Sequence, residues 1–143
     1  MIKEKANIAV FISGRGTNLK ALILRSKKKR CNYRVAYVIS NKKNVAGLKI
    51  AKKNKILTKI LSRSFLKTEQ KKLAKILIDK DIKFICLAGF MKILSPYFLK
   101  FFKNKIINIH PSLLPKYKGL NTHKRALEAK EKFSGCTIHY VSK

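Results

Sequence analysis

Residues 7–26 read NIAVFISGRGTNLKALILRS, and this stretch decides the fold. The apolar run 7–13 predicts a strand that is buried on both faces and ends at a glycine-bearing turn. After the turn, residues 18–30 carry Leu19, Leu22 and Ile23 at helical spacing and end in a basic last turn that suits the helix dipole. The stretch therefore predicts a buried strand, a tight turn and an amphipathic helix.

The same alternation continues along the chain. Further strands are predicted over residues 35–40, 56–61, 82–89, 105–110 and 136–141. Helices are predicted between them, over residues 46–55, 68–81, 96–103 and 122–130. This order predicts an α/β fold with a mostly parallel, doubly wound sheet. Because no internal repeat or proline-rich linker divides the chain, we expect one domain over residues 1–143.

The chain is strongly basic, with a net charge of +29 from 35 lysines and arginines and 6 acidic residues. Such a charge raises the hypothesis of a nucleic-acid-binding module. However, 29 of the basic residues are lysines spread along nearly every segment, as AT-rich codon usage would produce. Phe98, Phe101 and Phe102 sit at helical spacing typical of a core, and no aromatic RNA-binding motif is present. We therefore expect weak, nonspecific attraction to polyanions and no specific nucleic-acid partner.

The cysteines and hydropathy suggest a cytoplasmic protein without a membrane partner. Cys31, Cys86 and Cys136 are odd in number and form no CxxC pair, so neither a disulfide framework nor a zinc site is indicated. Idle or buried thiols in a reducing compartment are the preferred interpretation. No stretch approaches the roughly 18 consecutive apolar residues that span a bilayer, and the first apolar run is too short for a signal peptide.

The turn SGRGTNL, residues 13–19, is the first candidate site. Gly14 and Gly16 permit a tight turn, and the amides of Gly16, Thr17 and Asn18 would converge at a helix N-terminus, where a phosphate fits. The turn matches neither of the two common nucleotide-binding glycine patterns. The alternative is an ordinary strand-to-helix turn in which Thr17 or Asn18 caps the helix.

Two further stretches follow predicted strands. LAGFMKILSP, residues 87–96, could line a pocket for a flat ring beyond the strand end, although such an apolar stretch is also typical of a core. In NIHP, Asn108 and His110 alternate onto one face at the next strand end. A histidine that moves a proton beside an amide that stabilises a developing oxyanion suits acyl transfer. His123 and His139 are weaker candidates, and because no metal-ligand spacing is present we expect no metal.

These three motifs, in their order and spacing from residue 7 to about residue 141, resemble the phosphoribosylglycinamide (glycinamide ribonucleotide) formyltransferases. The resemblance implies a Rossmann-like fold and formyl transfer from 10-formyltetrahydrofolate to glycinamide ribonucleotide in de novo purine biosynthesis. Methionyl-tRNA formyltransferases share the Asn-x-His and the SLLP that follows it here at residues 112–115, but their first loop differs from SGRGTNL.

The resemblance also assigns roles to residues. It implies that the substrate phosphate is held by Gly16, Thr17 and Asn18. It implies that the formyl folate is contacted by Lys67, Met91, Lys92, Ile93, Leu94 and Asn108. Asn108 would stabilise the oxyanion and His110 would be the catalytic acid, with no metal required.

One part of the family pattern is not reached. In that family the strand matching residues 136–141 leads into an Asp-Gly-Gly segment whose aspartate orients and charges the catalytic histidine. We therefore expect a domain incomplete at its C-terminus, with a rate loss on the order of a hundredfold or more. The alternatives are an inactive remnant and one half of a split enzyme that a separate C-terminal fragment completes.

Overall fold

Six strands form one sheet in the computed structural model, which describes residues 4–141. Along the sheet they are β3 (Leu57–Ile60), β2 (Tyr33–Ser40), β1 (Ala6–Ile12), β4 (Ile82–Leu87), β5 (Ile106–His110) and β6 (Thr137–Tyr140). The first five are parallel to one another, and β6 pairs antiparallel with β5. The predicted mostly parallel sheet is confirmed, with each strand close to its predicted bounds.

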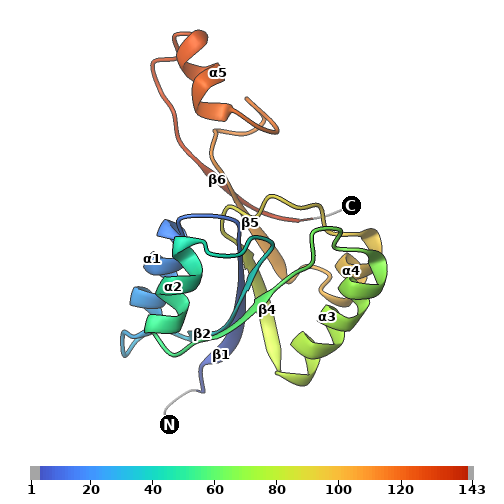
Figure 1. Cartoon of the computed structure of the whole chain (residues 1–143). Helices are drawn as coiled ribbons and strands as arrows, with labels where there is room; N and C mark the ends of the chain where they lie inside the picture. The colour runs from blue at the N-terminus through green and yellow to red at the C-terminus, as the bar shows by residue number, and fades with distance from the viewer. Residues whose placement is uncertain (1–3, 142–143) are drawn as a thin grey trace.

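Helices alternate with the parallel strands and cover both faces of the sheet. They are α1 (Thr17–Ser26), α2 (Ala46–Lys53), α3 (Lys67–Asp79), α4 (Pro96–Phe101) and α5 (Thr122–Glu128). Figure 1 shows α1 and α2 on one face, α3 and α4 on the other, and α5 projecting beyond β5 and β6. The doubly wound arrangement expected from the alternation is therefore present.

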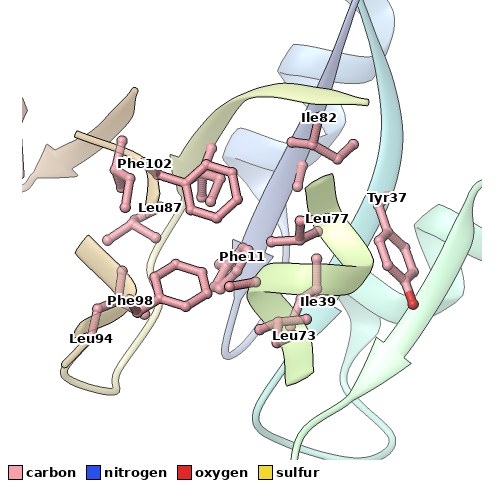
Figure 2. Close-up of a cluster of buried hydrophobic side chains, with 14 of the residues drawn as sticks. Phe11, Tyr37, Ile39, Leu73, Leu77, Ile82, Leu87, Leu94, Phe98 and Phe102 are labelled. Carbon is pink, nitrogen blue, oxygen red and sulfur yellow. The ribbon is translucent and has the colours of Figure 1, made fainter. Parts of the chain in front are cut away.

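Strand β1 is central because its side chains feed both cores. Val10 and Ile12 pack on the α1 and α2 side, and Phe11 packs on the α3 and α4 side, each with 0% of its surface exposed. Since side chains alternate along a strand, only a continuous apolar run can fill two cores at once. In Figure 2, Phe11 lies with Leu77 and Phe98 in the cluster between the sheet and α3 and α4.

One residue predicted to be core lies outside it. Phe98 and Phe102 are buried, but Phe101 is 43% exposed and stacks edge-on with Tyr97 at 5.0 Å between ring centroids. Residues four apart on a helix share a face, so Phe98 and Phe102 face inward together while Tyr97 and Phe101 line the next face. The prediction for Phe101 is wrong because one short helix can direct only one of these pairs at the core.

Two of the three cysteines are buried, as the sequence suggested. Cys31 and Cys86 are buried, Cys136 is exposed, and all three are free thiols. Among residues 4–141, no helix has both the length and the apolar character needed to cross a membrane.

Candidate active site

The first motif places the N-terminus of α1 at the carboxyl edge of the sheet. Gly16 is the N-cap, with φ of 76° in the left-handed region, and no side chain caps the helix. A Cβ on Gly16 would lie 2.6 Å from Cα of Gly47, so only glycine allows the two chain segments to approach this closely. The first amides of α1 lack side-chain acceptors and are available to an anion.

Ser13 joins the first motif to the second. Its Oγ donates to Oδ1 of Asn41 at 2.5 Å and accepts from the backbone amide of Met91 at 2.7 Å. The side chain is 5% exposed, so these bonds lie in a largely dry environment. The loop after β4 is further held by an edge-on contact between Phe90 and Phe11, with ring centroids 5.2 Å apart. The ends of β1, β2 and β4 are thus connected through one hydroxyl.

The third motif places Asn108 and His110 on β5, both half-buried. The Nε2 atom of His110 lies 3.1 Å from the carbonyl oxygen of Tyr117. Because a carbonyl can only accept, this contact requires Nε2 to carry a proton. The loop after β5 therefore bends back and orients the imidazole that precedes it.

A cleft of about 600 Å³ brings the three motifs together. From the sites predicted above, Asn18, Met91, Asn108 and His110 line it. The other lining residues come from β5, from the loops after β4 and β5, from the start of α5 and from β6: Gly89, Phe90, Ile109, Pro111, Leu114, Lys118, Gly119, Leu120, Asn121, Thr122 and His139. Segments that are up to 121 residues apart in the chain, from Asn18 to His139, thus share one concave surface.

Several predicted site residues lie beside this cleft rather than along it. Gly16 and Thr17 form the turn just before Asn18. Ile93 is 91% exposed, whereas Leu94 is 6% exposed and packs in the α3 and α4 core. Figure 2 shows Leu94 beside Phe98 in this cluster.

The two predicted basic contacts also lie outside the cleft. Lys92 donates from Nζ to the carbonyl oxygen of Arg63 at 3.0 Å. It lines a neighbouring cavity of about 690 Å³ together with Lys42, Lys43 and Arg63. Lys67 is the exposed first residue of α3. Lys92 is next to Met91 in the chain, so the basic cavity and the cleft adjoin at this loop.

His139, one of the weaker candidates in the sequence, is also a cleft residue. It lies directly opposite Asn108 in the antiparallel pairing of β5 and β6. Its Nε2 is 3.3 Å from Nδ2 of Asn108, and its Nδ1 is 2.9 Å from the carbonyl oxygen of Tyr140. No local motif marks this residue. In β6 the polar residues Thr137 and His139 are half-buried while Ile138 and Tyr140 are exposed, and the register had to be known to place His139 against Asn108.

The loop from Pro111 to Asn121 is held by a polar cluster that lines a separate cavity of about 360 Å³. Glu131 accepts hydrogen bonds from Nζ of Lys116 at 2.8 Å and from the Tyr117 hydroxyl at 2.9 Å. Both bonds lower the pKa of the Glu131 carboxyl, and the bond from Lys116 has the larger effect. The bond between Tyr117 and Glu131 also raises the pKa of the Tyr117 phenol. Arg125 lies over the Tyr117 ring, 5.3 Å from its centroid.

Acidic residues are absent from the part of the cleft that the described residues form. No Asp or Glu of residues 4–141 lines it, and within that range His110 has no carboxylate partner. A nearby carboxylate would both orient an imidazole and favour its charged form. Among the described residues, His110 is oriented instead by the backbone carbonyl of Tyr117.

The sequence of this chain is similar to a family profile and to several known proteins. The sequence profile described as "Formyl transferase" matches residues 6–143. The chain is 44% identical over 142 residues to the "Trifunctional purine biosynthetic protein adenosine-3" of Gallus gallus, covering 97% of this chain and 14% of that protein. It is 43% identical over 138 residues to the "Phosphoribosylglycinamide formyltransferase" of Haemophilus influenzae, covering 94% of this chain and 65% of the relative.

A solved structure shows the same fold. The phosphoribosylglycinamide formyltransferase from Brucella melitensis superposes with a TM-score of 0.92 at 36% sequence identity, over 97% of this chain and 74% of that one. The chain thus spans a small part of the trifunctional relative and about two thirds of the shorter one. With the profile matching nearly the whole chain and the three motifs meeting in one cleft, the chain belongs to the formyl transferase family.

Proposed function

We propose that this chain transfers a formyl group from 10-formyltetrahydrofolate to the amine of glycinamide ribonucleotide. The observation that supports this most directly is the cleft that joins Asn18 of the first motif to Met91, Asn108 and His110. A phosphate site, a ring-binding surface and an acyl-transfer pair are the three parts that such a reaction needs. The names of the relatives point to the same acceptor.

The cleft fits the two substrates by its chemistry. Phe90, Met91, Leu114 and Leu120 supply an apolar lining suited to a flat pterin ring. The uncapped N-terminus of α1 lies at the Asn18 end and suits the ribonucleotide phosphate. The net charge of +29 would speed the approach of both anionic substrates without adding specificity.

The chemistry follows from the two polar residues of β5. The formyl folate supplies the electrophilic carbon, which the glycinamide amine attacks. Asn108 would donate from Nδ2 to the formyl oxygen as negative charge develops there. His110, in its charged form, would stabilise the same oxygen through a ring proton that Tyr117 does not engage, and then assist the proton transfer from the amine to the departing folate nitrogen.

The site would be improved by a carboxylate beside His110. Among residues 4–141 none lines the cleft, so the carboxylate would come from outside the described residues, either in the same polypeptide or in a complementing fragment. The contacts of Gly16, Thr17, Lys67, Lys92, Ile93 and Leu94 with substrate stay predictions. That residues 1–143 form one domain and that the protein is cytoplasmic also stay predictions.

Two measurements on the 143-residue chain test the proposal. In the first, glycinamide ribonucleotide is titrated into ¹⁵N-labelled protein. The backbone amides of Gly16, Thr17 and Asn18 should shift together, and inorganic phosphate should compete. In the second, formyl transfer is followed by the absorbance of the deformylated folate. Asn108→Ala and His110→Ala should each lower kcat by roughly 100-fold or more.

The matched control is His123→Ala, which replaces an exposed histidine of α5 outside the cleft and should leave both measurements unchanged. Shifts in the first turn of α1 without transfer would support the binding site and locate the deficit in the chemistry. Failure of glycinamide ribonucleotide to bind, or formylation of methionyl-tRNA in its place, would contradict the proposed acceptor.

A further inference from the structure

His139 contacts Asn108, the residue proposed to stabilise the oxyanion, but the mechanism proposed above gives His139 no role. It projects from β6 into the cleft, opposite Asn108, and both side chains are half-buried. Its two ring nitrogens have different partners: Nδ1 faces the carbonyl oxygen of Tyr140 at 2.9 Å, and Nε2 faces the Asn108 side chain at 3.3 Å. Each partner restricts where the ring protons can be.

The hydrogen-bond roles follow from the partners. A backbone carbonyl only accepts, so Nδ1 of His139 must carry a proton. The Nδ2 amide of Asn108 only donates, so Nε2 must be unprotonated in order to accept from it. The arrangement is satisfied by one form of the ring, the neutral imidazole with its proton on Nδ1.

The Tyr140 carbonyl holds the proton of the neutral ring on Nδ1, so Nε2 is an acceptor, and this determines which way the Asn108 amide points. If the amide were turned by 180°, its oxygen would face an unprotonated ring nitrogen, and two acceptors would oppose each other. With Nδ2 toward His139, one of its protons is engaged and the second is available. An amide that was free to turn would present an oxygen to the formyl oxygen for part of the time, which is repulsive.

We propose that His139 is a positioning residue that holds the Asn108 amide with its nitrogen available as a donor to the reacting carbonyl. This inference rests on the proposed function for its catalytic consequence, but the orientation itself is a property of the free protein. The backbone fixes the pair, because Asn108 and His139 are directly opposite in an antiparallel ladder.

Two substitutions separate this role from a purely structural one. His139→Gln can place a side-chain amide oxygen near the position of Nε2 and so keep the acceptor for Asn108. His139→Asn is shorter and keeps a polar group only near the position of Nδ1, so it loses that acceptor. Both are neutral amides on the same edge strand, and equal urea unfolding midpoints would show that both fold.

The primary readout is the side-chain ¹⁵N–¹H₂ signal of Asn108, identified by its absence in Asn108→Asp. In the wild-type chain one of the two amide protons should be shifted downfield and should exchange slowly with water. His139→Asn should abolish this difference, and His139→Gln should restore most of it. His123→Gln, on the exposed face of α5, should have no effect.

The kinetic readout uses the same variants. His139→Asn should lower kcat for formyl transfer by at least about 10-fold with little change in KM, as expected when an oxyanion donor is misoriented. His139→Gln should recover most of that loss. Unchanged Asn108 signals in His139→Asn, or identical behaviour of the Gln and Asn variants, would overturn the proposal. If the wild-type chain shows no formyl transfer, the proposed function fails, while the Asn108 signals still decide the positioning role.

Discussion

The hydroxyl of Ser13 lies 2.7 Å from the backbone nitrogen of Met91, 78 residues further along the chain. The same hydroxyl donates to Asn41, so one buried side chain ties the ends of three adjacent strands together. This contact fixes the start of the loop that lies between the cleft and the basic cavity beside it. Rigid placement of such loops is what orients bound ligands.

Ser13→Ala should loosen this loop. Removal of the hydroxyl leaves the amide of Met91 without its acceptor, so we expect a loss of about 1–3 kcal/mol in the free energy of unfolding. Amide hydrogen exchange at Met91 should accelerate, and binding of formyl folate should weaken. Urea unfolding and exchange measured by NMR check this. Ser134→Ala, at an exposed serine, is the control and should change neither quantity.

Gly47→Ala should disturb the phosphate-binding turn from a distance in the sequence. A Cβ at Gly47 would lie 2.4 Å from Cδ1 of Ile12 and 3.3 Å from Cα of Gly16. Overpacking of this kind costs roughly 1–3 kcal/mol, and it would push the N-terminus of α1 away from α2. Gly14→Ala is the matched control, because a Cβ there meets nothing within 4 Å. Equal unfolding midpoints for the two variants would contradict the expectation.

Glu131 should make the stability of the chain depend on pH in the acid range. Its pKa is lowered in the folded protein by the hydrogen bonds from Lys116 and Tyr117. A group with a depressed folded pKa binds fewer protons when folded, so its stabilising effect is present above the ordinary glutamate pKa of about 4.3. That effect is lost as the pH falls through the folded value.

Glu131→Gln should therefore be less stable than the wild-type chain at neutral pH, and the difference should shrink as the pH is lowered below about 4. Urea unfolding at several pH values measures this. Glu128→Gln is the control, since Glu128 faces Lys124 at 3.8 Å on the exposed side of α5. A difference between wild type and Glu131→Gln that stayed constant down to about pH 3 would rule out the carboxylate as its cause.

The three cysteines should differ sharply in reactivity. Burial raises the pKa of the Cys86 thiol to about 11, so almost none of it is thiolate at neutral pH. Cys31 is also buried, whereas Cys136 is exposed. Iodoacetamide at neutral pH should modify Cys136 alone in the folded chain and all three in urea. Mass spectrometry of the peptides distinguishes the sites, and rapid modification of Cys86 in the folded chain would contradict its burial.

The fold and part of the site could be predicted from local patterns. A strand's burial and a helix's apolar face are set by neighbouring residues, so the alternation of elements and the two-sided core at β1 were predictable. Asn108 and His110 also share a face because positions two apart on one strand always do. Phe101 was mispredicted, because helical spacing alone does not say which of two adjacent faces meets the core.

The sequence by itself determined the order of the elements, the glycine turn before α1 and the pair of polar residues at the end of β5. Only the tertiary structure decided that His139 stands against Asn108, that Ser13 holds Met91 and that Gly16 packs on Gly47. These contacts depend on strand order and register, which arise from packing the whole sheet against its helices. No local sequence pattern carries that information: a shift of one residue in register, for example, would separate His139 from Asn108.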